Sequence, residues 1–148
     1  MWLGALASKG ITMNYQYLVT PFLAWLIAGI LKFTINSIKA KQLAFGLIGY
    51  GGLPSNHSAI VTSTATLIAL KEGINHPAFG VALTLAFIVI LDASSLRRQV
   101  GKHAQAINQL AIHSATPQTL RERMGHTPLE IAAGIIVGFI TATGVAII

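Results

Sequence analysis

The feature that most constrains the fold is a series of four apolar segments separated by polar linkers. They are residues 17–35, 57–70, 77–91 and 129–148. Charged residues make up only 9% of the chain, about a third of the fraction that is usual in a soluble domain. So few charges cannot cover the surface of a soluble domain of this size, whereas a lipid bilayer requires none. The pattern therefore predicts an all-α integral membrane bundle, a single domain of residues 1–148, with about four transmembrane helices.

The segments between and within these apolar regions differ in character. The first and last apolar segments approach the roughly 20 residues that a helix needs to cross a bilayer, and the middle two are shorter. Residues 43–53 are apolar but glycine-rich, and we expect a re-entrant segment, whose backbone a membrane tolerates only where protein or water covers it. Residues 101–113 carry apolar side chains at helical spacing, which predicts a short interfacial helix.

The positions of lysine and arginine predict the orientation in the membrane. Seven of them lie in the linkers that follow the first and third segments, against two, Lys9 and Lys71, on the other side. Because cytoplasmic loops carry the excess of basic residues, both linkers are expected in the cytoplasm of a bacterial-type inner or plasma membrane. The net charge of +6 is thus explained by topology. We expect no nucleic-acid partner, since the basic residues do not line a soluble face with aromatic residues among them.

A glycine-rich elbow, GYGGLPSNHSA, precedes the second apolar segment. Ser55 and Asn56 are typical of a helix start, whose free backbone N–H groups bind anions, phosphate above all. The glycines before them permit close approach of a ligand to the backbone, and His57 lies within reach of the same ligand. The same residues also fit an ordinary N-cap followed by a hydrogen-bonded histidine at the interface.

A second motif, GHTPLE, opens the last apolar segment. His126 and Glu130 are four residues apart and would share a face if one helix contained both. A carboxylate in that position can accept the N–H of one imidazole nitrogen and leave the other nitrogen free as a nucleophile or base. The alternative is a capped helix start with Glu130 near the positive end of the helix dipole.

Small residues recur every four positions after Glu130, which permits close helix packing. They are Gly134, Gly138, Ala142 and Ala146. We expect this packing within the chain rather than between copies, so the sequence does not strongly indicate an oligomer.

Basic residues accompany both motifs: Lys32, Lys39, Arg97, Arg98 and Arg121. Snorkelling side chains and topology explain most of them, but Lys32 lies inside the first apolar segment. Asp92 closes the third apolar segment and is expected to pair with a nearby cation. The chain has no cysteine and only four carboxylates, in separate segments, so we expect neither a metal site nor another cofactor.

A lysine, a Pro-Ser-x-His motif and then a basic residue ahead of His-x-x-x-carboxylate, in this order, resemble the type 2 phosphatidic acid phosphatases, relatives of the vanadium haloperoxidases. More closely, GGLPSNHSA, DASSLRRQVGKHA and GHTPLEIAAG resemble the divergent branch of that superfamily. The resemblance covers nearly the whole chain from Lys32 onward.

This resemblance implies a role for each motif residue. His126 matches the nucleophile that forms a phosphohistidine, Glu130 the aspartate that orients it, and His57 the general acid. Ser55 and the backbone N–H of Asn56 match the phosphate cradle, although the parent motif has glycine at the second position.

The same resemblance implies a cationic phosphate site. Lys32 matches its first lysine, and Lys39 falls where the family has an arginine. The arginine expected six residues before the nucleophile is replaced by Leu120. We favour Arg98 and Arg121 in its place, with Arg97 as the alternative and Asp92 supporting one of these guanidinium groups.

The resulting hypothesis is a metal-independent lipid phosphate phosphatase. Its substrate would be a phospholipid phosphomonoester of the cytoplasmic leaflet, such as phosphatidylglycerol phosphate or phosphatidic acid. One alternative is a prenyl phosphate or diphosphate phosphatase. Another is a catalytically silent membrane protein that binds anionic lipid or phosphate through the same groups. A small transporter subunit is disfavoured because no inverted repeat is visible.

Overall fold

The computed structural model describes residues 15–43, 52–111 and 119–148, and this part of the chain is helical without strands. The predicted re-entrant segment, residues 43–53, lies almost entirely outside the described residues. The helices are α1 (Gln16–Ala40), α2 (Asn56–Lys71), α3 (Pro77–Ser94), α4 (Leu96–Ala111) and α5 (Pro128–Ile147). The predicted all-α membrane class is therefore confirmed.

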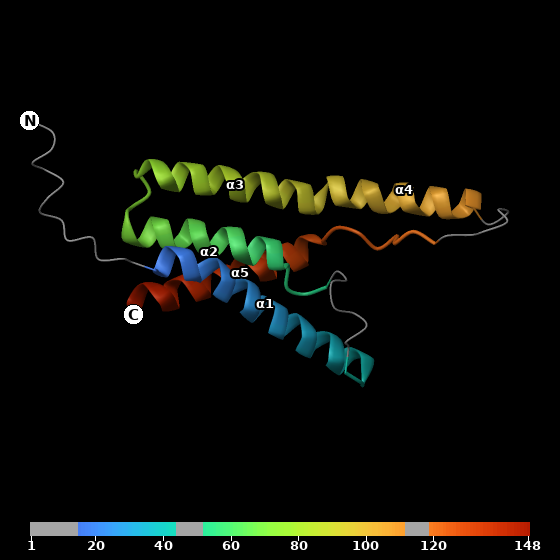
Figure 1. Cartoon of the computed structure of the whole chain (residues 1–148), viewed down its shortest axis with the longest axis horizontal. Helices are drawn as coiled ribbons and strands as arrows, with labels where there is room; N and C mark the ends of the chain where they lie inside the picture. Colours follow the sequence, from blue (N-terminus) through green and yellow to red (C-terminus); the bar gives the residue numbers. More distant parts are fainter. Residues whose placement is uncertain (1–14, 44–51, 112–118) are drawn as a thin grey trace, which may run out of the picture.

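Each predicted apolar segment forms one helix, namely α1, α2, α3 and α5. Three helical stretches are long and apolar enough to span a membrane: α1, α5 and the run Pro77–Ala111, which joins α3 to α4. In Figure 1, α4 continues close to the direction of α3 and extends beyond the other helices. With 16 residues, α2 is only about 24 Å long, which is less than the thickness of the hydrocarbon core.

The short helix α2 lies at the centre of the bundle, where it contacts α1, α3 and α5. Its buried positions are mostly small or polar, including Ser58, Ala59, Ser63 and Ala65. The Ser63 hydroxyl donates a hydrogen bond of 2.8 Å to the carbonyl of Ile60, so this polar side chain is satisfied within its own helix. Because neighbouring helices cover α2, its polar residues do not face lipid.

Two glycines of α5 set the distance between α2 and α5. A Cβ atom at Gly138 would lie 2.5 Å from the carbonyl oxygen of Ala59, and one at Gly134 would collide with the carbonyl oxygen of Ser55. Only glycine allows the two backbones to approach this closely. The prediction that these glycines pack within the chain is confirmed.

The helix ends that carry the predicted motifs lie together. The start of α2, the start of α5 and the end of α3 are at the same end of the bundle (Figure 1). At the opposite end, the Tyr17 hydroxyl donates to Glu72, and the Gln16 side chain donates to the carbonyl of Val145. Elsewhere, large apolar side chains of α1, α3 and α5 point outward and are exposed, as expected of helices that contact lipid.

Replacing Gly138 by alanine is expected to destabilise the bundle by about 1–3 kcal/mol, because the methyl group would meet backbone atoms that cannot move aside. The matched control is Gly144→Ala in the same helix, where a Cβ atom has no described neighbour within 4 Å. This control should be neutral or stabilising by up to about 1 kcal/mol. The free energy of unfolding in detergent measures both, and equal values would contradict the packing described.

Candidate active site

The site is assembled from three parts of the chain that backbone hydrogen bonds join. The N–H of Ser55, before α2, donates to the carbonyl of Glu130 in α5 at 2.9 Å. The N–H of His126 donates to the carbonyl of Ala93 near the end of α3, also at 2.9 Å. The elbow and the GHTPLE motif, more than 60 residues apart in the sequence, are thereby fixed beside each other.

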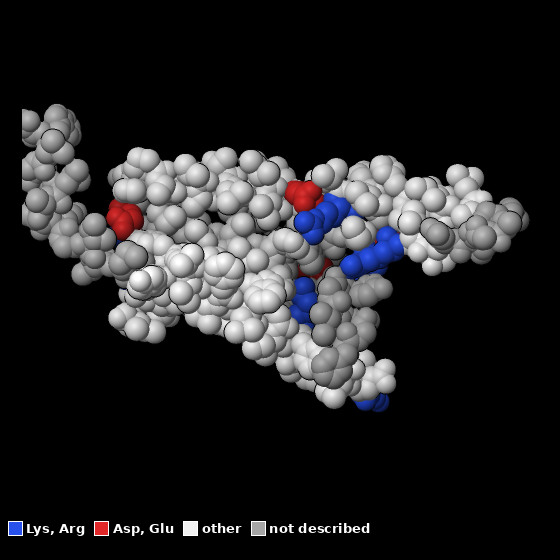
Figure 2. Space-filling model, in the orientation of Figure 1, with Lys and Arg blue, Asp and Glu red and all other residues white. Residues whose placement is uncertain are grey.

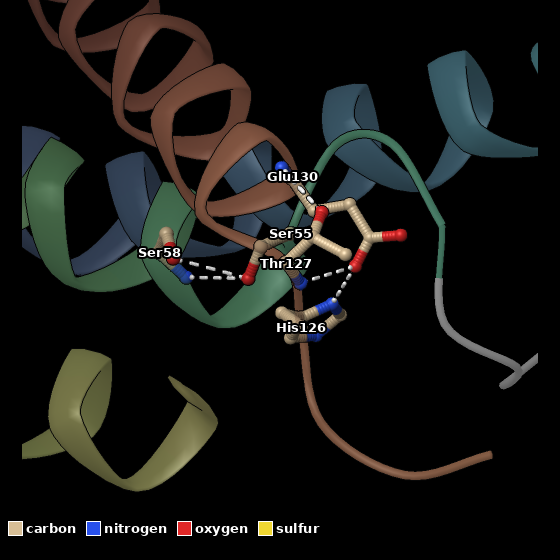
Figure 3. Close-up of polar contacts among 5 residues, drawn as sticks. All are labelled: Ser55, Ser58, His126, Thr127 and Glu130. Atoms are coloured by element: carbon tan, nitrogen blue, oxygen red, sulfur yellow. Dashed lines mark hydrogen bonds and ion pairs between the residues drawn. The ribbon is translucent and has the colours of Figure 1, made fainter. Parts of the chain in front are cut away.

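Ser55 is the N-cap of α2, as the sequence predicted for the start of this helix. Its hydroxyl oxygen accepts hydrogen bonds from the Ser58 N–H at 3.3 Å and the Ser58 hydroxyl at 3.0 Å. The side chain is fully buried and turns towards Ser58 (Figure 3). The capping interpretation thus describes the Ser55 side chain, and its contact with phosphate stays a prediction.

The elbow packs against α1. Gly52 has a positive φ of 141°, and a Cβ atom there would lie 3.4 Å from the side-chain oxygen of Asn36. The Asn56 side chain lies against Gly29, two helical turns before Asn36 on α1, where its Nδ2 would be 3.8 Å from a Cβ atom. The conformation of the elbow therefore requires glycine at position 52, and Gly51 lies outside the described residues.

His126 and Glu130 form a buried pair in which imidazole Nδ1 lies 3.0 Å from carboxylate Oε2. The expected shared helical face does not produce this contact, because Thr127 is the N-cap and α5 begins at Pro128. Glu130 Oε2 also accepts the Thr127 N–H at 3.1 Å, and the Thr127 hydroxyl oxygen accepts the Glu130 N–H at 3.3 Å. Glu130 thus completes a capping box and holds the imidazole at once (Figure 3).

A second histidine faces this pair. The ring centroids of His57 and His126 are 6.1 Å apart, with the planes tilted by 54°. The Nδ1 atom of His57 is buried without a hydrogen-bond partner in the described part of the protein. Two imidazoles that are distant in the sequence therefore lie close together. One of them, His57, has a ring nitrogen without a hydrogen-bond partner in the described part of the protein.

Positive charges surround the two histidines. Burial and the positive charges of Arg97, His126 and Lys32 lower the pKa of His57, while the negative charge of Asp92 acts in the opposite direction. Lys32 also interacts with the charge of Glu130, and the Arg97 Nε lies 2.9 Å from the Asp92 carboxylate. Figure 2 shows Lys and Arg gathered where α3 passes into α4. Lys32, Arg97 and Asp92, all predicted from the sequence, are brought together here.

The other predicted cations lie in different surroundings. The Arg98 side chain packs on Gly125, where a Cβ would be 2.7 Å from its Cγ. Arg121 donates from Nε to the carbonyl of Arg123 at 3.3 Å. Lys39 is exposed and follows Lys32 by seven residues, about 10 Å along α1. Among the arginines, Arg97 is thus the one whose charge acts most strongly on His57.

Residues 119–126, which end at His126, run back along α4. The sequence did not predict this contact. The Asn108 side chain donates to the Leu120 carbonyl and accepts from the Leu120 N–H, at 2.8 and 2.7 Å. A Cβ atom at Gly101 would collide with the carbonyl of Glu122, and Gly125 has a positive φ of 83°. A glycine inside a predicted helix was the available signal, since it often marks close backbone approach.

The described residues contain no group of three or more His, Asp or Glu side chains that could hold a metal ion. The two carboxylates near the histidines are already engaged, Glu130 with His126 and Thr127, and Asp92 with Arg97. The site therefore contains two imidazoles and nearby cations, and both of its carboxylates are occupied by protein partners.

These features define an all-helical membrane protein with a histidine–carboxylate pair and a second histidine at one end of its bundle. The chain belongs to the Divergent PAP2 family, whose model matches residues 13–141. It is similar to a protein of Bacillus subtilis (strain 168) named "Uncharacterized membrane protein YuiD", with 31% identity over 140 residues that cover 83% of this chain and 89% of the relative. No solved structure matches the chain. Family membership and the resemblance drawn from the motifs agree.

Substituting Gly101 by alanine is expected to release residues 119–126 from α4, because the new methyl group would collide with the backbone of Glu122. Amide hydrogen exchange in this segment should rise about tenfold. The control is Gly80→Ala in α3, where a Cβ has no described neighbour within 4 Å and exchange should not change. Unaltered exchange in the Gly101 variant would show that the segment is held by other means.

Proposed function

We propose that this protein is a metal-independent lipid phosphate phosphatase that acts through a phosphohistidine at His126. The observation that carries the proposal is the contact of 3.0 Å between His126 Nδ1 and Glu130, with the His57 ring 6.1 Å from the His126 ring. A contact at Nδ1 fixes the tautomer in which this atom carries the proton and donates it to the carboxylate. The lone pair then resides on Nε2, which is free to attack phosphorus.

In the first step, His126 Nε2 forms a bond to phosphorus while the bond from phosphorus to the lipid oxygen breaks. The imidazole becomes positively charged, and the buried Glu130 carboxylate stabilises that charge. His57 gives a proton to the departing alkoxide. Burial and nearby cations lower the pKa of His57, so the proposal relies on the negative charge of the bound phosphate to favour its protonated form. The unpartnered Nδ1 atom of His57 supports this role, since a buried polar atom without a partner gains a hydrogen bond when a ligand arrives.

In the second step, water attacks the phosphohistidine and the nitrogen–phosphorus bond breaks. His57, now neutral, accepts a proton from the water, and inorganic phosphate leaves. His126 regains its original state, so the cycle is balanced without a metal or another reactant.

The cations supply the electrostatic part of the catalysis. Phosphoryl transfer spreads negative charge over the equatorial oxygens, and catalysis consists mostly of positioning and stabilising them. Lys32 and Arg97 are the candidates that the charge interactions with His57 favour. The N-terminal backbone of α2, including the Asn56 N–H, adds a positive helix end. The roles of Ser55, Lys39, Arg98 and Arg121 in binding phosphate remain part of the proposal.

A membrane lipid is the substrate class that fits a site at the end of a bundle of apolar helices. The basic linkers lie at the same end as the site, so the proposal places the reaction at the cytoplasmic face. Phosphomonoesters of that leaflet, such as phosphatidylglycerol phosphate or phosphatidic acid, are then the leading candidates.

Mutations of the pair should separate chemistry from helix capping. With EDTA present, His126→Ala should lower phosphate release from lipid phosphomonoesters by at least about a thousandfold. Glu130→Gln preserves an oxygen for the Thr127 N–H but removes the charge, and should cost about 10²- to 10⁴-fold. Thr127→Ala removes the cap and should cost about 1 kcal/mol of stability with less than a tenfold change in rate. Release is measured in detergent from a panel that includes prenyl phosphates.

Two results would reject the proposal. Activity that survives in the His126 variant would exclude this nucleophile. Binding of lipid phosphate without any release by the wild-type protein, in the presence or absence of EDTA, would establish the silent binding protein instead. Orthovanadate should inhibit an active enzyme, because its trigonal-bipyramidal ester with histidine resembles the transition state.

The orientation can be measured with single cysteines, since the chain has none of its own. Gln105→Cys in α4 and Asn75→Cys before α3 lie at opposite ends of the bundle, and both positions are exposed. An impermeant maleimide added to intact cells should label position 75 and reach position 105 only after permeabilisation. The reverse pattern would place the site outside the cytoplasm and remove the argument for this choice of substrates.

A further inference from the structure

A stripe of large apolar side chains on α4 has no partner among the described residues. Leu96, Val100, Ile107 and Leu110 are exposed by 61, 44, 49 and 81%, in a helix of which half the residues are polar or charged. On a neighbouring face of the helix, by contrast, Gly101 and Ala104 are buried. The return segment, residues 119–126, packs at Gly101 and Asn108 and leaves the stripe uncovered.

The stripe has the spacing of a coiled coil. Together with His103 its members follow one another at intervals of four, three, four and three residues, which is the alternation of a and d positions in a heptad repeat. Val100 and Ile107 occupy a, and Leu96, His103 and Leu110 occupy d. β-branched residues at a with leucine at d favour two parallel strands.

The placement of α4 also favours a second copy of the chain, rather than the bilayer surface, as the partner of this stripe. The helix continues along α3 and leaves the bundle instead of turning across its end (Figure 1). Backbone hydrogen bonds bridge the junction, from the Ser95 N–H to Leu91 and from the Gln99 N–H to Ser95. Two copies inserted in the membrane with the same orientation would project their α4 helices side by side in the same direction.

We propose that the α4 helices of two copies associate as a parallel two-stranded coiled coil through Leu96, Val100, Ile107 and Leu110. Three of the five flanking e and g positions within α4 are alanines, Ala104, Ala106 and Ala111, and the other two are Arg97 and Gln99. Ala104 is already buried within the chain. Two heptads would be marginal in water, but anchoring in one membrane raises the effective concentration of the partners. The return segment attaches mainly at b positions, Gly101 and Asn108, and so lies beside the interface.

Disulfide trapping in membranes tests this dimer in the full-length, naturally cysteine-free protein. Leu96→Cys and Leu110→Cys, both at d, should each form a disulfide-linked dimer on mild oxidation. Gln105→Cys at f and Lys102→Cys at c serve as matched exposed controls and should give about tenfold less dimer, because their Cβ atoms point away from the partner. Adding Val100→Asp to the Leu110→Cys protein should lower its dimer yield about tenfold, whereas adding Gln109→Asp at a c position should not.

Three outcomes would overturn the proposal. Equal trapping at positions 105 and 110 would indicate random collision, and trapping at His103→Cys but at neither end would indicate antiparallel helices. Failure to trap at either end, with a fluorophore at position 107 quenched by a lipid-borne quencher, would place the stripe on the bilayer. None of these readouts depends on phosphatase activity, so the dimer and the proposed function can fail separately.

Discussion

Glu130 is the residue on which the arrangement of the site depends. Its carboxylate accepts hydrogen bonds from the Thr127 N–H and is paired with His126 Nδ1, while its backbone carbonyl accepts from the Ser55 N–H. A carboxylate buried at the end of an apolar helix is costly unless it is fully partnered. One residue thus starts α5, orients the imidazole and ties the elbow of α2 to both. The Glu130 carboxylate contributes both to helix capping and to the position of the imidazole.

The position of this residue depends in turn on how closely α2 and α5 pack. Gly134 and Gly138 allow the α5 backbone to lie directly on the carbonyls of Ser55 and Ala59. The close contact begins one helical turn after Glu130 and aligns the N-terminal ends of both helices. Each of these ends carries the partial positive charge of a helix dipole, although Ser55 caps α2 and Thr127 with Glu130 caps α5. Together with Lys32 and Arg97, two helix ends make this part of the bundle attractive to an anion before any particular ligand is considered.

Hydropathy predicted the helices well because a bilayer restricts a chain to few solutions. The four apolar segments match α1, α2, α3 and α5, and α1 extends only five residues beyond its predicted end. The order of the motifs also predicted that His57, His126 and Glu130 lie together. In a short motif such as GHTPLE, part of the local geometry is readable from neighbouring residues, as the capping box of Thr127 and Glu130 shows.

What the sequence left open depends on contacts between distant segments. The choice among Arg97, Arg98 and Arg121 could not be made from spacing, because the direction of each side chain follows from where the return segment meets α4. Whether one helix contains both His126 and Glu130 was left open, and the N-cap at Thr127 places His126 just outside α5. The docking of residues 119–126 on Gly101 and Asn108 involves no periodic pattern at all. Such contacts are decided by steric fit between backbones, which composition and hydropathy do not record.

The junction between α3 and α4 combines two functions that would otherwise require separate elements. Asp92 and Arg97 form an ion pair there, and the Arg97 charge acts on His57. Between them, the carbonyl of Ala93 accepts the His126 N–H, and Gly125 packs on Ala93 and Arg98. A rotation of α4 about this junction would therefore move Arg97 and also Arg98, on which Gly125 packs, whereas the Ala93 carbonyl that holds the His126 N–H belongs to α3. Restraining α4, whether by the return segment or by a second copy, consequently restrains Arg97 relative to the histidines.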